Sequence, residues 1–534
     1  MKRRYLALIP ITGLALALLA VATHGQQAPR LAAKQVAIRG LAAGDVNTFD
    51  PAYSNTSQDA PIMTGVMEGL VQNPPGEIST NFLPALAERW EVSPDGRTYT
   101  FHLRRGVNFH GNYGPFTAAD VEFSLNRYRD AKESIWAAQY ANIAGVQAVD
   151  PYTVRVTLKA ADPFFLGKVA TDTESGSLML SKKAFEQNGK QAMRLHPIGT
   201  GPFKFEEYRT KDRVVLSRND NYWGGKPILE QVLYRYMPSA SARELAVVAG
   251  EIHSMRASID AKLIERLKRQ GLIIDTFGPE ISWMLHLNLT RKPLDDVRVR
   301  RAIAHAIKKE DLAGFMGRDL AEPIASIIPA SYFGGLKTEE MPTNLRYAYD
   351  PAQARKLLAE AGLPNGFELS MIISERSDYR EMMTIIQQQL KQVGINVQLN
   401  LVDHTTYHAQ GMKDVNPMFL IGDLSYPEAG LMLKRFYHSL FIVGKPTGVR
   451  NYSHYDSKQV DAWLEEAERT GDLNKRKQLY AEIQKQAMQD VPVVPVVATK
   501  QPSARRPELD LGYTLKSSLV LETRFTKDTR ILQR

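Results

Sequence analysis

The sequence predicts an α/β protein built from more than one domain. At 534 residues the chain is longer than a single hydrophobic core usually serves, so two or three domains are expected. Strand and helix patterns also alternate along the chain. Between Ile281 and Leu312 a short apolar run predicts a strand, and Val299, Ile303 and Ile307 then recur at helical spacing. A strand that leads directly into an amphipathic helix is typical of α/β architecture.

Residues 1–25 predict an export signal. Three basic residues at positions 2–4 precede an apolar stretch over 5–22, and the small residues at 20–22 fit a cleavage site. The alternative, a membrane anchor, is disfavoured because the apolar core is short and small residues follow it. The chain has no cysteine, which excludes disulfides, thiolate metal sites and a lipid-carrying cysteine after the signal. We therefore expect a periplasmic protein that is not lipid-anchored.

The composition argues against a nucleic-acid partner. The formal net charge is +9, of which three charges lie in the predicted signal, and the contents of hydrophobic (44%) and charged (23%) residues are ordinary for a globular protein. The densest basic cluster, residues 298–301, lies close to Asp295, Asp296 and Glu310. A nucleic-acid surface would need clustered basic residues with interleaved aromatics. We expect no binding to nucleic acid.

The first half of the mature chain shows strand and helix signals in turn. Residues 98–103 alternate apolar and polar side chains after a Ser-Pro-Asp-Gly turn, which predicts a half-buried strand. Thr117 and Asp120 form a capping box that predicts the start of a helix. Ser241 and Glu244 predict the start of another helix in the same way.

The second half has a more regular pattern. Asp295 is the predicted N-cap of the helix that follows the opening strand. Further on, residues 367–373 and 395–401 predict two strands on either side of one apolar helical stripe over 379–393. This order predicts a strand–helix–strand unit with a right-handed crossover. A β-branched run over 491–497 ends the pattern.

Several sequence motifs resemble, in matching order, those of a known family. The family is the extracytoplasmic solute-binding proteins of ABC importers, in the peptide, dipeptide and nickel class (solute-binding protein family 5). The motifs are LAERWEVSPDGRTYTFHLRRGVNFH (86–110), FTAADVEFSLNR (116–127), GTGPFKF (199–205), NDNYWGGKP (219–227), LNLTRKPLDDVRVRRAIAHAI (287–307) and YDPAQARKLLAEAGLPNGFEL (349–369). The matching segments run from about residue 47 to residue 497, nearly the whole mature chain.

This resemblance implies the two-lobed periplasmic binding protein fold. Two α/β lobes are then joined by two hinge crossings, and an extra subdomain is inserted in the first lobe. The implied domains are a signal peptide over 1–25, lobe I over 26–277 with the inserted subdomain at about 60–190, lobe II over 278–492, and a return to lobe I over 493–534. Members of the family capture a small-molecule or peptide ligand between the lobes and deliver it to an ABC permease in the inner membrane. We therefore expect a monomeric binding protein and not an enzyme.

The resemblance also implies where the ligand binds. In the family, residues just after an early Asp-Pro, near the first crossing and from the second lobe converge on the cleft. The candidate ligand-binding residues here are Tyr53, Ser54, Asn55, Trp283, Asp423, Ser425, Tyr426, Asn451 and Tyr452. For each aromatic residue among them the alternative is packing in the core. We expect no catalytic residue, no metal site and no cofactor.

The segment around Asp423 indicates which class of solute the protein binds. Peptide binders of the family commonly show Trp-x-x-Asp-Tyr-x-Asp-Pro, in which the Asp pairs with the α-ammonium group of the ligand. Aligned on Tyr426-Pro427, this chain has Gly422 at the Trp position and Ser425 at the Asp position. A serine cannot neutralise a buried ammonium group. We therefore favour a modified amino-acid conjugate, a sugar-like solute or another small organic solute. The alternative is a generic oligopeptide or dipeptide binder that uses Asp423 as its amine anchor.

Three other classes of function are weaker alternatives. His404 and His408 form an i, i+4 pair that could hold a metal with a third ligand, as in a nickel-type site, but the Glu of H-E-x-x-H is absent. The turn at 199–202 lacks the G-x-S-x-G pattern, and no serine has a recognisable base and acid, which disfavours a secreted hydrolase. A periplasmic holdase would need an exposed apolar surface, which the sequence does not predict.

Overall fold

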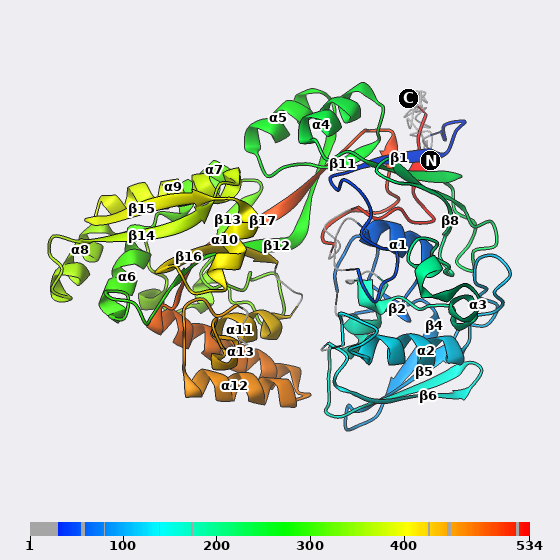
Figure 1. Ribbon diagram of the computed structural model, residues 1–534, viewed down its shortest axis with the longest axis horizontal. Helices are drawn as coiled ribbons and strands as arrows, with labels where there is room; N and C mark the ends of the chain where they lie inside the picture. Colours follow the sequence, from blue (N-terminus) through cyan, green and yellow to red (C-terminus); the bar gives the residue numbers. More distant parts are fainter. Residues whose placement is uncertain are drawn as a thin grey trace, which may run out of the picture.

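The computed structural model shows two lobes that lie side by side (Figure 1). The described residues are 30–54, 59–79, 81–137, 139–171, 175–424, 428–445, 450–518 and 523–533. One large hydrophobic core extends from Ala37 to Phe277 and includes residues near the C-terminus, and another extends from Trp283 to Val497. A third, smaller cluster contains Val247, Leu263 and Ala504. Within this described part, no helix is both long enough and apolar enough to cross a membrane.

Lobe I combines one half of a large sheet with an inserted subdomain. Its part of the large sheet consists of β1 (Val36–Leu41), β8 (Phe203–Arg209), β9 (Arg213–Arg218), β10 (Gln231–Tyr236) and β11 (Ser254–Arg256), with α1 (Ala60–Val66), α4 (Ala240–Ala249) and α5 (Ala261–Arg269). The subdomain contains β4 (Ala87–Val92), β5 (Thr98–Leu103), β6 (Ile143–Asp150) and β7 (Thr153–Leu158) in the order β4-β5-β7-β6, with α2 (Ala118–Arg129) and α3 (Lys182–Met193). Two short pairs complete this lobe, β2 (Val71–Gln72) with β3 (Leu83–Pro84) and β18 (Leu509–Asp510) with β19 (Arg530–Ile531).

Lobe II surrounds the other end of the large sheet with helices. Its helices are α6 (Val297–Ala306), α7 (Lys309–Met316), α8 (Pro351–Glu360), α9 (Ser377–Lys391), α10 (His404–Gly411), α11 (Ala429–Tyr437), α12 (Lys458–Arg469) and α13 (Leu473–Asp490). Its strands are β13 (Ala321–Pro323), β14 (Phe367–Ser374), β15 (Ile395–Val402) and β16 (Met418–Leu424). The strands β14 and β15 pair in parallel on either side of α9, which confirms the predicted strand–helix–strand unit.

Two long strands join the lobes, β12 (Ile273–Leu287) and β17 (Val493–Arg505). Among the described residues nine strands form one sheet in the order β16-β12-β17-β11-β1-β10-β9-β8, with β13 beside β17. On the lobe I side Phe277 pairs with Gln501, and on the lobe II side Ile281 pairs with Thr499. The register shifts between these two pairs, and Figure 1 shows both strands crossing between the lobes at this point. The two hinge crossings implied by the resemblance are therefore confirmed.

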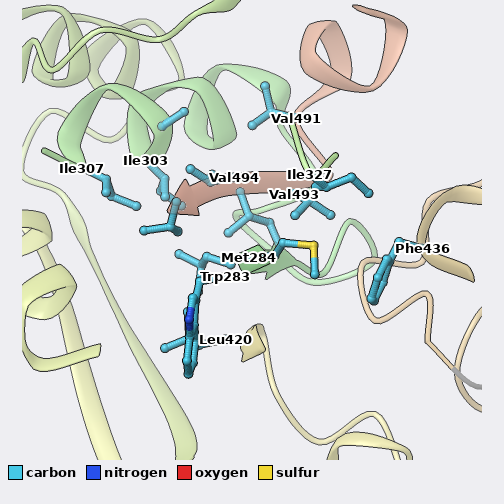
Figure 2. Close-up of a cluster of buried hydrophobic side chains, with 14 of the residues drawn as sticks. Trp283, Met284, Ile303, Ile307, Ile327, Leu420, Phe436, Val491, Val493 and Val494 are labelled. Carbon is cyan, nitrogen blue, oxygen red and sulfur yellow. The ribbon is translucent and has the colours of Figure 1, made fainter. Parts of the chain in front are cut away.

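The core of lobe II begins where β12 leaves the crossing. Figure 2 shows Met284 of β12, Val494 of β17 and Ile303 of α6 in one cluster, and all three side chains are buried. Ile303 belongs to the apolar stripe that predicted this helix, so the amphipathic face of α6 packs against the joining strands.

Two helix starts differ from the prediction by one or two residues. The cap of α6 is Asp296, whose carboxylate accepts a backbone hydrogen bond, and not Asp295. The cap of α4 is Ser239, so Ser241 lies inside the helix. In each case a second capping residue stands close by, and local sequence rules do not choose between neighbours. The predicted capping box at Thr117 is confirmed.

Two of the sequence motifs meet at one buried carboxylate of lobe I. Glu68 is 3% exposed and accepts hydrogen bonds from the Thr200 hydroxyl at 2.8 Å, the Tyr222 hydroxyl at 2.7 Å and the Trp223 indole at 2.9 Å. Burial raises the pKa of Glu68, and the three hydrogen bonds act in the opposite direction. The donors lie in the GTGPFKF and NDNYWGGKP motifs, so these motifs stabilise lobe I.

Replacing Ile303 with alanine should lower the free energy of unfolding by about 2–5 kcal/mol, because a fully buried side chain leaves a cavity. Urea denaturation followed by circular dichroism measures this loss. The matched control is Lys356→Ala on α8, where the side chain is 68% exposed and a change of less than about 0.5 kcal/mol is expected. Equal stability of Ile303→Ala and the control would contradict the packing of α6 on β12.

Candidate ligand-binding site

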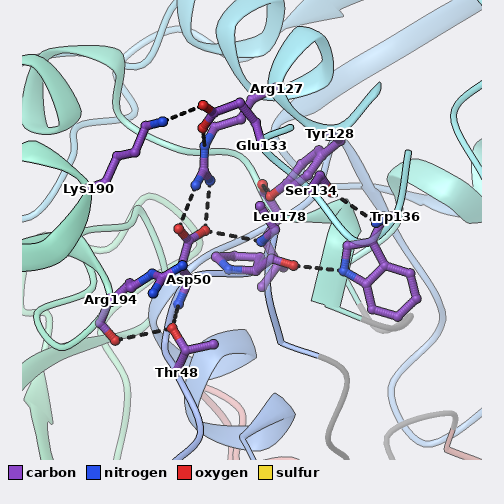
Figure 3. Close-up of polar contacts among 12 residues, drawn as sticks. Thr48, Asp50, Arg127, Tyr128, Glu133, Ser134, Trp136, Leu178, Lys190 and Arg194 are labelled. Carbon is purple, nitrogen blue, oxygen red and sulfur yellow. Dashed lines mark hydrogen bonds and ion pairs between the residues drawn. The ribbon is translucent and has the colours of Figure 1, made fainter. Parts of the chain in front are cut away.

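The first candidate residues follow Asp50 in lobe I. Asp50 is 1% exposed and accepts two hydrogen bonds from the guanidinium group of Arg127, at 2.7 and 2.6 Å (Figure 3). This two-point geometry is the strongest form of an arginine–carboxylate contact. Asp50 also accepts a hydrogen bond from the backbone N–H of Ala52 at 3.1 Å. The pair therefore fixes the start of the segment that carries Tyr53 and Ser54.

Tyr53 and Ser54 have different surroundings. Tyr53 is half-buried, and the guanidinium carbons of Arg127 and Arg194 lie 5.5 and 4.4 Å from the centroid of its ring, which is cation–π geometry. Ser54 is buried, and its hydroxyl donates a hydrogen bond to the Asp59 carboxylate at 3.4 Å. Tyr53 thus keeps an accessible edge that a ligand can contact, whereas the Ser54 side chain serves the fold.

Trp283 is buried at the start of lobe II. It is 2% exposed, and its indole N–H donates a hydrogen bond to the Thr499 hydroxyl at 3.3 Å. Its ring packs edge-on against the ring of Tyr379, with 4.9 Å between the ring centroids. Gly422 lies opposite Trp283 on β16, where a Cβ atom would come within 2.9 Å of an Ile281 methyl group and 3.1 Å of the indole ring. The Ile281 and Trp283 side chains of β12 therefore leave little room for a side chain at position 422.

Asp423 lies at the edge of lobe II next to the crossing, because it pairs with Ser282 on β12. Its side chain is 14% exposed. Two guanidinium groups approach the same carboxylate oxygen, that of Arg435 at 3.8 Å and that of Arg450 at 4.0 Å. The carboxylate of Asp423 thus already faces two positive charges.

Asn451 is completely buried and holds the loop between α11 and α12. Its side-chain amide donates to the Tyr455 carbonyl at 2.8 Å, and its side-chain oxygen accepts from the Tyr455 N–H at 3.1 Å. The next residue, Tyr452, is 5% exposed and stacks on Phe419 at 4.3 Å. Asn451 therefore positions its neighbours Arg450 and Tyr452 through the backbone. Its side-chain amide forms hydrogen bonds with the backbone of the loop.

Three candidates, Asn55, Ser425 and Tyr426, lie outside the described residues. Their neighbours in the sequence are placed, since Ser54 precedes the first of them and Glu428 follows the other two.

His404 and His408 lie together on α10, with ring centroids 4.5 Å apart. One ring nitrogen of His404 lies 3.0 Å from the Ser374 hydroxyl, and the other lies 3.1 Å from the Arg376 guanidinium. Burial, together with His404, Arg450 and Arg376, lowers the pKa of His408 to about 4, so this ring is neutral at pH 7. In the part of the chain that the structure describes, no group of three or more His, Cys, Asp or Glu side chains is arranged to hold a metal.

The lobes also touch away from the crossings. The ring of Phe164 in lobe I packs edge-on against the ring of Phe333 in lobe II, with 5.4 Å between the ring centroids. The guanidinium carbon of Arg476 lies 5.1 Å from the centroid of the Phe164 ring. Beside this contact a hollow of about 610 Å³ lies between residues 93–97 of the inserted subdomain and 469–472 of lobe II. Phe164 therefore forms a bridge between the lobes.

Sequence patterns did not predict that Phe164 contacts lobe II or that Arg435 and Arg450 lie near Asp423. The signal for Arg435 was its place on a helix directly after the candidate segment, and Arg450 precedes the candidate Asn451. Neither position distinguishes a site residue from an ordinary surface cation.

Replacing Arg127 with alanine should lower the free energy of unfolding by about 3–5 kcal/mol, because the buried carboxylate of Asp50 loses its partner. Denaturant unfolding measures this loss. Lys190→Ala, which removes a 56% exposed cation from Glu133, is the control and should cost less than about 1 kcal/mol. The double variant Asp50→Ala/Arg127→Ala should cost less than the sum of the two single variants, and additive costs would argue against the pair.

Most of the chain is similar in sequence to known proteins of one family. The family model for "Bacterial extracellular solute-binding proteins, family 5 Middle" matches residues 81–441. The glutathione-binding protein GsiB of Salmonella choleraesuis (strain SC-B67) is 30% identical over 503 residues, which cover 92% of this chain and 94% of the relative. The protein of the same name from Escherichia coli O1:K1 / APEC is 31% identical over the same lengths.

Solved structures of similar proteins share both lobes. The binding protein MoaA from A. tumefaciens R10, in complex with mannopinic acid, is 34% identical with a TM-score of 0.79, and the match covers 94% of this chain and 100% of that chain. The periplasmic binding protein DppA from Helicobacter pylori, in complex with the peptide STSA, is 27% identical with a TM-score of 0.75 and covers 94% and 99%. With the two-lobed fold and the family match over residues 81–441, these likenesses show that the chain belongs to family 5 of the bacterial extracellular solute-binding proteins, the binding components of ABC importers.

Proposed function

We propose that this protein is the periplasmic solute-binding component of an ABC importer. It captures a small organic solute between its lobes and delivers it to a permease in the inner membrane, and it breaks no bond in the solute. One observation carries the proposal, namely that two lobes with separate cores are joined through the paired strands β12 and β17. Such a pair of lobes can close around a ligand, as hinged binding proteins do.

The predicted signal and the lack of cysteine support export without a lipid anchor, and we propose that the mature protein acts as a monomer. The proposal assigns residues 26–277 to lobe I, with the inserted subdomain at about 60–190, and begins lobe II at residue 278. We propose that the return to lobe I falls after Val497 and not at Val493, because the side chains of this stretch pack in the core of lobe II.

Ligand binding and closure of the lobes are linked, because candidate site residues lie next to the crossing. Trp283 and Asp423 lie close to the crossing, whereas Phe164 touches lobe II on the side away from it. A ligand that contacts both lobes binds the closed arrangement more strongly than the open one, and this difference in affinity drives closure. The contact of Phe164 with Phe333 adds to the same closed arrangement.

The relatives suggest the class of solute. GsiB is a glutathione-binding protein, MoaA was solved with mannopinic acid and DppA was solved with the peptide STSA. Gly422 and Ser425 stand where the amine-anchor pattern of the family's peptide binders has Trp and Asp. We therefore propose a modified amino-acid conjugate, a sugar-like solute or another small organic solute, rather than generic peptides. Nickel-type binding is a weaker candidate, because both ring nitrogens of His404 already have partners.

Isothermal calorimetry with mannopinic acid, glutathione and the dipeptide Met-Leu tests the proposal. We expect one-to-one saturable binding of mannopinic acid or glutathione, with the ligand recovered unchanged, and much weaker binding of the dipeptide. Native mass spectrometry of protein purified without denaturation complements the experiment, because it detects a solute that remains bound. Micromolar binding of Met-Leu that collapses in Asp423→Asn would restore the peptide alternative, and chemical turnover would contradict a binding role.

Replacing Phe164 with alanine should open the lobes, because it removes an aromatic contact of about 1.5 kcal/mol from the closed arrangement. Small-angle scattering of the unliganded variant should give a larger radius of gyration than the wild type. The calorimetric affinity for the solute should fall about tenfold. Phe315→Ala, at a 40% exposed position on α7, is the control and should change neither quantity. An unchanged radius and affinity in Phe164→Ala would contradict a role in closure.

A further inference from the structure

The hydrogen-bond ladder between β12 and β17 is interrupted at the crossing. Phe277 pairs with Gln501 and Ile281 pairs with Thr499, so residues 278–280 of β12 lie opposite a single residue of β17. An irregularity of this kind leaves backbone N–H and C=O groups without their partners in the ladder. Such groups need other partners where they are shielded from water.

A segment near the C-terminus supplies these partners at Gly278, the first residue of the irregularity. The Gly278 N–H donates a hydrogen bond to the Lys516 carbonyl at 3.1 Å, and the Gly278 carbonyl accepts one from the Ser518 N–H at 2.6 Å. Gly278 and Ser517 also form a parallel β-bridge. We refer to residues 513–518 as the brace. Both backbone polar groups of Gly278 are thus bound to the brace.

The brace is held in lobe I by the turn at Gly76. The N–H groups of Lys516 and Ser517 donate to the Gly76 carbonyl at 2.7 and 2.9 Å, and the Ser517 hydroxyl accepts from the Ile78 N–H at 2.7 Å. Gly76 has a φ of +74°, and a Cβ atom there would lie 2.4 Å from the Thr514 carbonyl oxygen. The brace and the turn can therefore approach this closely only with glycine at position 76.

Side chains of the brace also belong to lobe I. Leu515 is 8% exposed and packs in the core of this lobe. The Tyr513 hydroxyl donates to the Arg524 carbonyl at 2.7 Å. The ion pair of Lys516 with Glu77 is largely exposed, at 64% and 44%, and adds little stability. The brace is therefore part of lobe I and moves with it.

The strand β17 changes its other neighbour at the same level of the crossing. Ser503 pairs with Arg256 of β11, and Thr499 pairs with Ala321 of β13. Residues 500–502 therefore lie between a strand of lobe I and a strand of lobe II. Rotation of the lobes at this level leaves the strand pairing within each lobe intact.

We propose that the brace is a hinge restraint, which holds Gly278 to lobe I so that closure bends β12 at residues 279–280 and β17 at residues 500–502. Glycine has the greatest backbone freedom of all residues, so an unrestrained Gly278 would lengthen the flexible part of the crossing. Closure onto a ligand would then have to remove more conformational freedom. This inference rests on the proposed binding function and adds the element that confines the hinge motion.

Spin labels test the restraint in the full mature protein without any ligand. The chain has no cysteine, so Lys182→Cys on α3 and Lys356→Cys on α8 give one labelling site in each lobe. The two lysine side chains are 49% and 68% exposed. Double electron–electron resonance spectroscopy then measures the distribution of distances between the lobes.

Two variants release the brace. Gly76→Ala forces the turn and the brace apart, and Ser517→Ala removes the acceptor of the Ile78 N–H. We expect each variant to broaden the distance distribution. Hydrogen–deuterium exchange of fragments that cover residues 273–281 should show the Gly278 amide exchanging about 5–10-fold faster, because its hydrogen bond to the brace opens more often.

Two controls make the test specific. Gly225 also has a positive φ, of +99°, but among the described residues no atom lies within 4 Å of a Cβ atom added there, so Gly225→Ala is the matched control. Lys516→Gln removes only the exposed ion pair. Both should leave the distances and the exchange unchanged. The thermal unfolding midpoint checks that each variant is folded, and Ser517→Ala carries the test if Gly76→Ala does not fold.

The outcomes separate this inference from the proposed function. An unchanged distance distribution in the folded brace variants, with or without faster exchange at Gly278, would overturn the restraint. Equal broadening in Gly225→Ala would overturn it as well. Chemical conversion of mannopinic acid or glutathione, or the absence of any bound solute, would instead contradict the proposed function, and these unliganded measurements do not depend on that result.

Discussion

The pairing of β12 with β17 is the constraint on which the rest of the structure depends. The two strands share hydrogen bonds in both lobes, with Phe277 opposite Gln501 on one side and Ile281 opposite Thr499 on the other. Because their side chains are buried in the core on each side, the strands cannot slide within a lobe. Relative motion is therefore confined to the few residues where the register shifts. Side chains next to this point keep their geometry during closure, and side chains far from it move most.

Carboxylate–arginine contacts serve different purposes in the two lobes. In lobe I, Arg127 donates two short hydrogen bonds to the Asp50 carboxylate. Both side chains are buried, and the positive charge of one offsets the negative charge of the other. That arrangement stabilises the segment that carries Tyr53, and breaking it leaves a buried charge. In lobe II the carboxylate of Asp423 lies 3.8 Å from the guanidinium group of Arg435 and 4.0 Å from that of Arg450. The lobe I pair fixes the backbone before Tyr53, and the lobe II cluster lies at the edge next to the crossing, where Asp423 pairs with Ser282.

The sequence predicted the fold better than the site, and the residues show why. The capping box at Thr117 and the strand–helix–strand unit depend on neighbours in the chain, so local patterns were sufficient. The choice of Asp296 over Asp295 as a cap differs by one residue and depends on how the preceding turn enters the helix. The small space left at Gly422 by Ile281 and Trp283 depends on the register between β12 and β16, which joins distant parts of the sequence. The meeting of two arginines at Asp423 has the same origin.

Solute capture requires a contact that favours the closed lobes, whereas release to the permease requires that the lobes can open again. A contact that favours the closed state raises the fraction of protein competent to hold the solute, and the apparent affinity rises with that fraction. Too large an interface would keep the solute from the permease. The contact of Phe164 with Phe333 and Arg476 consists of one aromatic side chain, which is worth a few kcal/mol at most. Its size suits a clamp that closes on a ligand and opens again when another protein separates the lobes. Glu428 connects the two regions, because it follows the candidate segment 425–427 and its carboxylate contacts the Tyr480 hydroxyl beside Phe333. The surface that receives Phe164 therefore includes a tyrosine that contacts Glu428.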